Sequence, residues 1–242
     1  SNMLIGVIDS GFLGSDVNDG KDNNLYQQQG FYLENDQVEA KPTTGDMLGH
    51  GTVITESILT QVPDAQIAMA QVFHQRLVTT PLQIVAAIDW LISLNVSVIN
   101  MSFGLPNDRQ LLHEAVKRAR DNNIIVVASS PARGNLVFPA AYPEVVSATG
   151  DARCQPDEFS WLNTKQADFA ACVRSSNPNV IGASVGCANV AGHIARYVKQ
   201  ASVIDLTQMT EWLKEHAKYW GLEDRVELRR KSTKPLNKTM IF

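Results

Sequence analysis

Cysteine is scarce in this 242-residue chain, which contains only Cys154, Cys172 and Cys187. The number is odd, and no two of the three stand at the spacing of metal ligands. A disulfide framework and a cysteine zinc site are therefore not expected. We interpret the three residues as reduced thiols that pack as small core side chains, which is typical of a reducing compartment. The composition thus predicts a cytoplasmic protein.

Long apolar runs and a strong charge of one sign are also missing. No stretch of about 18 apolar residues could cross a bilayer, so we expect no membrane partner. No basic start leads into an apolar stretch with a small-residue cleavage site, so no signal peptide is expected. The formal net charge of −4 gives no reason to expect a nucleic-acid partner.

The chain has enough apolar material for a substantial core, because 44% of its residues are hydrophobic. We interpret Ser1 and Asn2, which precede Met3, as a remnant of an expression tag. Residues 3–242 are expected to form a single domain. Its end, residues 222–242, reads as a basic C-terminal tail.

Strand and helix patterns alternate along the chain. Continuous apolar runs at residues 4–8, 67–73, 96–101 and 124–128 are typical of strands that are buried on both faces of a parallel sheet. Amphipathic patterns over residues 50–60, 81–94, 111–119, 190–198 and 206–220 predict helices. Together they predict an α/β fold of three layers, with a mostly parallel central sheet and helices on both faces.

Residues 182–192 are almost all small, and Ser184 stands near their start. Free backbone N–H groups and the positive end of the helix dipole lie at the first turn of a helix. A serine placed there can react through an intermediate that bears an oxyanion, because the negative charge is stabilised. The alternative is that Ser184 is only an N-cap on a tightly packed helix.

Two further turns each combine a reactive side chain with glycine. Asp9 ends the first apolar run and is followed by Ser10 and Gly11, at the carboxyl end of a strand where functional groups gather in open α/β sheets. His50 stands in the sequence Gly-His-Gly-Thr at the start of a predicted helix. Ser184, His50 and Asp9 could thus serve as nucleophile, base and orienting acid.

At these residues the chain resembles the subtilisin-like serine proteases, or subtilases. The motifs Asp-Ser-Gly, His-Gly-Thr and Gly-Ala-Ser occur in the order Asp, His, Ser that is known for subtilisin. The resemblance covers roughly residues 4–200 and implies that Asp9, His50 and Ser184 form a catalytic triad. It also implies that Ser102, Phe103 and Gly104 pair with an extended peptide substrate.

The sequence departs from the family after residue 128. Subtilases usually continue there with Ala-Ala-Gly-Asn, and the asparagine side chain supplies the second donor of the oxyanion hole. Here the chain continues with Ser129 and Ser130, which we also expect to contact substrate. A direct alignment with the family then places Ala132 at the position of the asparagine. An insertion of three residues would bring Asn135 into it instead.

The consequence for the oxyanion hole stays open at this point. Losing such a donor typically lowers turnover by about 10²–10³-fold. The hole could keep only the N–H of Ser184, use Asn135 through a rebuilt loop, or borrow Arg133 or a serine hydroxyl. Alternatively, Asn135 belongs to an ordinary Gly-Asn turn.

No metal or cofactor is expected. Asp16, Asp19 and Asp22 lack the spacing and the final glutamate of a calcium loop. The calcium loop that many secreted subtilases insert into the helix after the histidine is missing, because this chain passes directly from helix to strand.

These observations predict a serine endopeptidase whose partner is a peptide or protein substrate. The absence of room for a leader or propeptide before residue 4 indicates an intracellular processing protease. The competing hypothesis is a weakly active or inactive subtilase fold that binds peptides or a partner protein, and the altered oxyanion loop motivates it.

Overall fold

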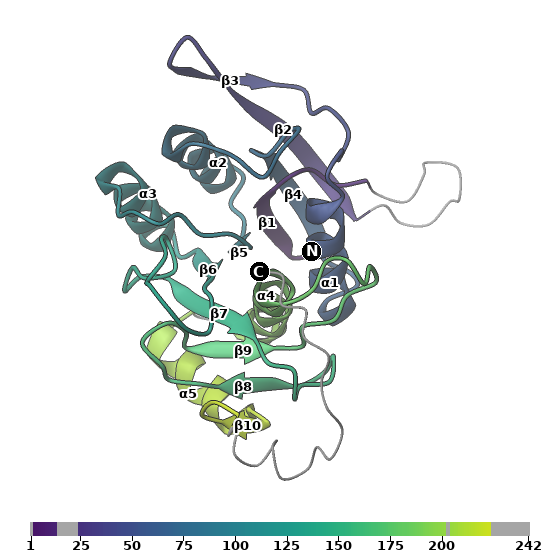
Figure 1. Cartoon of the computed structure of the whole chain (residues 1–242), viewed down its shortest axis with the longest axis vertical. Helices are drawn as coiled ribbons and strands as arrows, with labels where there is room; N and C mark the ends of the chain where they lie inside the picture. Colours follow the sequence, from purple (N-terminus) through teal and green to yellow (C-terminus); the bar gives the residue numbers. More distant parts are fainter. Residues whose placement is uncertain (1, 14–23, 202–203, 224–242) are drawn as a thin grey trace.

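The computed structural model describes residues 2–13, 24–201 and 204–223 (Figure 1). The three aspartates considered for calcium, Asp16, Asp19 and Asp22, lie outside the described residues. So does the basic C-terminal tail from residue 224 onward.

One ten-stranded sheet runs through the described residues, in the order β10-β8-β9-β7-β6-β5-β1-β4-β2-β3. Only the pairs β8–β9 and β2–β3 are antiparallel, so the predicted, mostly parallel sheet is confirmed. In chain order the strands are β1 (Leu4–Asp9), β2 (Leu25–Glu34), β3 (Gln37–Lys41), β4 (Gln66–Gln71), β5 (Val98–Met101), β6 (Ile125–Ser129), β7 (Val146–Gly150), β8 (Phe159–Trp161), β9 (Phe169–Ala171) and β10 (Tyr219–Trp220).

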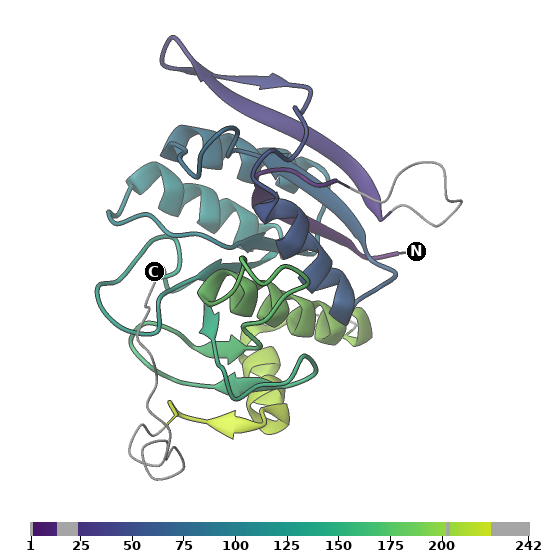
Figure 2. The same ribbon diagram turned by 45° about the vertical axis from the view of Figure 1, so that its right-hand side comes forward.

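Helices cover both faces of the sheet, as predicted. Their bounds are α1 (His50–Gln61), α2 (Pro81–Ser93), α3 (Gln110–Asp121), α4 (Ala183–Gln200) and α5 (Leu206–His216). Helices α1, α4 and α5 pack in one apolar core and α2 and α3 in the other, with side chains of the central strands alternating between the two. Helices α1 and α4 lie side by side, because Gly192 approaches the side chain of Gln61 (Figure 2).

The local structure differs from the sequence patterns at two places. Residues 25–34 form a ten-residue strand that continues into an antiparallel hairpin, with Asn35 and Asp36 at positive φ in its turn. The helix expected over residues 206–220 ends at His216, and Tyr219 and Trp220 then pair with β8 at the edge of the sheet. Two residues of an edge strand carry no detectable alternation, so sequence periodicity could not separate them from the helix.

The chain order places a switch point between β1 and β5. After β1 the chain forms β2, β3 and β4, which all lie on one side of β1 in the sheet, and it then crosses to the other side of β1 as β5. Crevices form at the carboxyl ends of strands where the winding reverses in this way. Asp9, at the end of β1, and residues 102–104, just after β5, therefore lie at the same edge of the sheet.

The expectation that residues 3–242 form a single domain stays a prediction. Among the described residues, no helix is both long enough and apolar enough to cross a bilayer.

Candidate active site

Asp9 and His50 are in direct contact. The Nδ1 atom of His50 lies 2.8 Å from Oδ1 of Asp9, and the Asp9 side chain is fully buried. The same Oδ1 accepts a hydrogen bond from the backbone N–H of Ser10 at 2.7 Å. Because this carboxylate engages Nδ1, Nε2 is the ring nitrogen of His50 that another group could engage.

Helix α1 brings His50 to this position because its first turn packs against the backbone that follows β1. The N-cap residue Gly49 has φ 70°, a conformation that glycine adopts without strain. A Cβ atom on Gly51 would lie 2.2 Å from the carbonyl oxygen of Gly11. Only glycine therefore allows the first turn of α1 to pack on the backbone that follows Asp9.

Ser184 stands in the first turn of α4, where the sequence placed it. Gly182, the N-cap residue, has φ 93° and turns the chain into the helix. The carbonyl oxygen of Ser184 accepts a hydrogen bond of 2.8 Å from the hydroxyl of Ser102, and that hydroxyl accepts one of 2.9 Å from Nδ2 of Asn100. The end of β5 thus holds the start of α4 in place.

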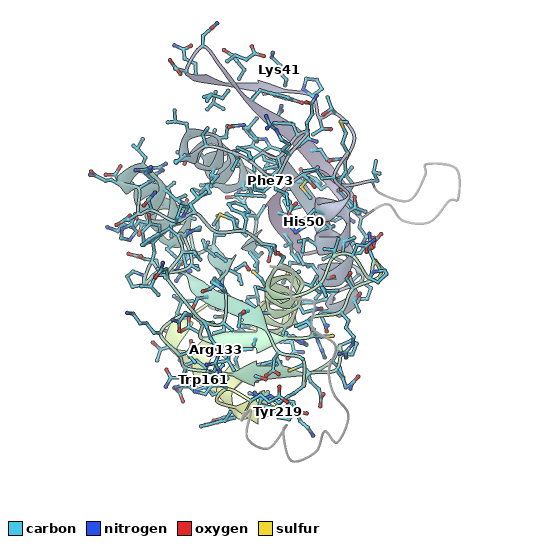
Figure 3. The ribbon with its side chains drawn as sticks, viewed as in Figure 1. Lys41, His50, Phe73, Arg133, Trp161 and Tyr219 are labelled. Carbon is cyan, nitrogen blue, oxygen red and sulfur yellow. The ribbon has the colours of Figure 1, made fainter. Side chains whose placement is uncertain are left out.

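One cavity of about 390 Å³ brings together His50, Ser184 and residues 102–104. Its other walls are mostly apolar and come from the segments after β4 and β5; they are Phe73, Leu77, Val78, Thr79 and Leu105. Phe73 meets Phe103 edge to face, with the ring centres 5.1 Å apart. Figure 3 shows His50 and Phe73 near each other on this part of the molecule.

The pKa of His50 is raised above its ordinary value of 6.5. Burial by itself lowers the pKa of the imidazole, but the hydrogen bond and charge of Asp9 outweigh burial, and the charge of Asp46 adds to them. Cys187, one helical turn after Ser184, is fully buried, and burial raises the pKa of its thiol to about 12. This thiol stays neutral at physiological pH, which fits the packing role expected for it.

Asn135 and Arg133, which were considered as donors to the oxyanion hole, are not among the residues that line this cavity. Asn135 is exposed. Arg133 lines a different hollow with Arg153 and Leu222, and Figure 3 shows it toward Trp161 and Tyr219, away from His50.

Ser129 and Ser130, expected to contact substrate, are both buried at the end of β6. The N–H of Ser130 donates to Ala148, and its hydroxyl donates to the carbonyl of Pro131. In the described ranges, no group of three or more His, Cys, Asp or Glu side chains is arranged to hold a metal ion.

Sequence reasoning missed two parts of this region. The apolar wall formed by Phe73 and residues 77–79 carries no motif, and only the fold brings it to the cavity. A buried carboxylate, Asp46, joins the start of α1 to the end of β1. Its position four residues before His50, in the loop that leads into the helix, was the available signal.

Comparison with known proteins agrees with this geometry. The model of the subtilase family (Peptidase_S8) matches residues 1–230. The chain is 29% identical to the minor extracellular protease Epr of Bacillus subtilis over 61% of its own length, and 29% identical to the major intracellular serine protease of the same organism over 62%. It spans 23% of the first relative and 55% of the second.

A solved structure described as "S41 Psychrophilic Protease" has the same fold. It superposes with a TM-score of 0.65 over 89% of this chain and 82% of its own, at 19% identity. The match of the family model over nearly the whole chain, together with the strand order and the crevice at β1 and β5, leads to one conclusion: this chain belongs to the subtilase family of serine proteases.

Proposed function

We propose that the chain is a serine endopeptidase in which Ser184 is the nucleophile, His50 the general base and Asp9 the residue that orients His50. The observation that carries this proposal is the 2.8 Å contact between His50 and Asp9, made at the mouth of a cavity that Ser184 also lines. In a structure without substrate, the contact between base and nucleophile is often long and tightens only when substrate binds.

The reaction follows from these positions. Ser184 Oγ forms a bond to the carbonyl carbon of the scissile peptide while its proton passes to Nε2 of His50. The C–N bond then breaks, and the leaving amine takes that proton. A water molecule then attacks the acyl-enzyme in the same way and gives a proton to His50. The ester bond breaks, His50 returns the proton to Ser184 Oγ, and the carboxylic acid is released. Asp9 stabilises the imidazolium that forms in each half of the reaction.

Residues 102–104 are suited to hold an extended peptide. Among the described residues, none makes a hydrogen bond to their main-chain N–H or C=O groups, so these groups remain available to a substrate strand. The adjoining cavity wall is mostly apolar, so we expect it to accept an apolar side chain of the substrate.

The backbone N–H of Ser184 is the donor that we assign to the oxyanion hole. Asn135 is exposed and is not among the residues that line the cavity, so we do not assign it a donor role. A hole with one donor is expected to turn over about 10²–10³-fold more slowly than a complete one. This supports a processing enzyme with few substrates over a digestive enzyme.

We place this activity inside the cell. All three cysteines are free and buried. Free thiols are typical of proteins that work in a reducing compartment. Of the two relatives at 29% identity, one is named an intracellular and the other an extracellular protease, so the free cysteines carry this proposal.

Mass spectrometry after incubation with a fluorophosphonate tests the proposal. A single adduct on Ser184 is expected, because the reagent needs an activated hydroxyl. The adduct should disappear in Ser184→Ala and fall by several orders of magnitude in His50→Ala. Ser57→Ala, which alters a buried hydroxyl bonded within α1, is the matched control and should label like the wild type.

The altered oxyanion loop favours one competing function, a subtilase fold that binds peptides without cleaving them. Folded wild-type protein that shows no adduct, yet retains a peptide in a pull-down that Phe103→Ala abolishes, would favour this function over the protease.

A further inference from the structure

Asp46 is buried at the junction of three segments, with 7% of its surface exposed. Both carboxylate oxygens are used. Oδ1 accepts hydrogen bonds from the hydroxyl of Ser10 at 2.7 Å and from the N–H of Gly49 at 3.0 Å. Oδ2 accepts from the N–H and the hydroxyl of Thr52, at 2.9 and 2.6 Å. Ser10 directly follows Asp9, while Gly49 and Thr52 flank His50.

A second bridge reinforces the first. The hydroxyl of Ser10, which donates to Asp46, also accepts a hydrogen bond from the N–H of Gly51 at 2.8 Å. The loop that holds Asp46 is itself fixed, because the buried amide of Gln71 donates to the carbonyl oxygens of Ser10 and Thr44. The N–H groups at the start of α1, which have no partner within the helix, are thereby hydrogen-bonded to Ser10 at the end of β1, either directly or through Asp46.

This arrangement does more than cap a helix. An ordinary N-cap is a local contact, as in α5, where Asp205 accepts from the N–H of Gln208. Asp46 instead joins the backbone on both sides of His50 to the residue after Asp9. The relative position of the two side chains that meet at 2.8 Å is set by this junction.

The charge of Asp46 also reaches the imidazole. In the described part of the chain, the charged groups that act on His50 are Asp9 from β1 and Asp46 from the loop before α1. The thiol of Cys187, on α4, faces Asp9 but is uncharged. Removing the charge of Asp46 therefore leaves Asp9 as the one charge that favours the imidazolium.

We propose that Asp46 is a positioning residue, which holds the imidazole of His50 against Asp9 through its hydrogen bonds to Ser10, Gly49 and Thr52. This inference rests on the proposed function insofar as it concerns the reaction, but its effect on His50 can be measured without activity.

The test compares a variant that changes both the charge and the hydrogen bonding of the junction with one that changes its hydrogen bonding alone. Asp46→Asn removes the charge and places an amide N–H₂ among hydrogen-bond donors. Ser10→Ala breaks the bridge but leaves the charge. The rate of fluorophosphonate labelling of Ser184 is measured from pH 5 to 9. In parallel, NMR follows the titration of the five histidines, with His50→Ala assigning the resonance.

For Asp46→Asn, we expect the labelling rate at pH 8 to fall about 10–100-fold. We also expect the midpoint of the pH profile and the NMR titration of His50 to move down by about 0.5 pH unit. For Ser10→Ala, the rate should also fall, and both midpoints should move down less than in Asp46→Asn, because the charge of Asp46 remains. Asp205→Ala, which removes a capping carboxylate from a helix away from the cavity, should change neither quantity.

An Asp46→Asn protein that keeps both the wild-type rate and the wild-type midpoints would overturn the proposal. Equal losses in Asp46→Asn and Asp205→Ala would do the same, because they would report lost stability alone. If Asp46→Asn does not fold, an unchanged rate in Ser10→Ala is the contrary result. If the wild type itself is not labelled, the protease function fails, and the NMR titration still decides the role of Asp46.

Discussion

The absence of a side chain at Gly51 determines how closely α1 can approach the strand that carries Asp9. At Gly51 a Cβ atom would lie 2.2 Å from the carbonyl oxygen of Gly11 and 3.0 Å from the N–H nitrogen of Ser10. Both are backbone atoms, which cannot turn aside as a flexible side chain can. Any larger residue at this position must therefore move the first turn of the helix, and His50 with it.

Gly51→Ala tests this point at the scale of one atom. Alanine is the better helix former, yet we expect the free energy of unfolding to fall by about 1–3 kcal/mol because of the backbone clash. Urea denaturation measures this change. In Gly45→Ala, the new Cβ would meet only a methyl group of Leu13 at 3.9 Å, and stability should stay within about 0.5 kcal/mol. Similar stabilities for the two variants would contradict this account.

The raised pKa of His50 gives opposite pH dependences to stability and to reactivity. Its folded pKa lies above the ordinary 6.5, so its contribution to stability is complete below that value and is lost as pH rises through the folded pKa. The base must be neutral to accept a proton, so reactivity should appear over the same rise in pH. We expect fluorophosphonate labelling to have a midpoint above pH 6.5. A midpoint below 6.5 would show that burial, and not Asp9, dominates the imidazole.

At the scale of elements, β5 and α4 are joined by a short chain of polar groups. Asn100, Ser102 and the carbonyl of Ser184 form this chain, and Asn100 and Ser102 are buried. The contact places the N-terminus of α4 relative to the strand end that is expected to hold the substrate. A helix and a strand that are distant in sequence thus acquire a fixed relation at the cavity.

Ser102→Ala should weaken this junction. The carbonyl of Ser184 and the amide of Asn100 lose their shared partner, so we expect about 1–3 kcal/mol of lost stability and a labelling rate about 10-fold lower or more. Thermal unfolding and labelling measure the two effects. Ser57→Ala removes a buried hydroxyl that donates a hydrogen bond to a carbonyl oxygen within α1, and it should leave both stability and labelling nearly unchanged. Equal behaviour of the two serine variants would mean that the Ser102 contact is dispensable.

At the scale of the whole molecule, one edge of the sheet is β10, a strand of only two residues. Arg153 contacts this edge: its guanidinium pairs with Asp151 at 2.8 Å, donates to the carbonyl of Gly221 at 2.7 Å and lies over the ring of Tyr219. The Asp151 side chain is only 5% exposed. The pairing lowers the pKa of Asp151, although burial alone would raise it.

Arg153→Ala should release β10 and leave the carboxylate of Asp151 buried without its cation. We expect a loss of about 3 kcal/mol in stability and faster amide hydrogen exchange at residues 219–221. Arg118→Ala breaks a surface pair with Asp89 in which both side chains are nearly half exposed, and it should cost at most about 1 kcal/mol. Exchange at residues 219–221 that stays at the wild-type rate in Arg153→Ala would rule out a role of Arg153 in holding β10.

Much of the fold could be predicted from local pattern. The parallel strands β1, β4, β5 and β6 are continuous apolar runs, and α2 begins at Pro81 with Thr80 and Gln83 in a capping box. The second hairpin strand, β3, is largely exposed and polar, so its residues carry no signal of burial. Tyr219 and Trp220 form a strand through their pairing with β8, a partner that is distant in the sequence.

Sequence alone determined the class of fold and the three candidate residues, because apolar runs and glycine-bounded turns are local features. It placed Asp9, His50 and Ser184 each at the end of an element, but it could not show that Asp9 and His50 meet. That contact, the apolar cavity wall of Phe73 and residues 77–79, the exposed position of Asn135 and the junction at Asp46 were decided by tertiary structure. The physical reason is that each depends on how closely segments from different parts of the sheet pack, a distance that no local pattern encodes.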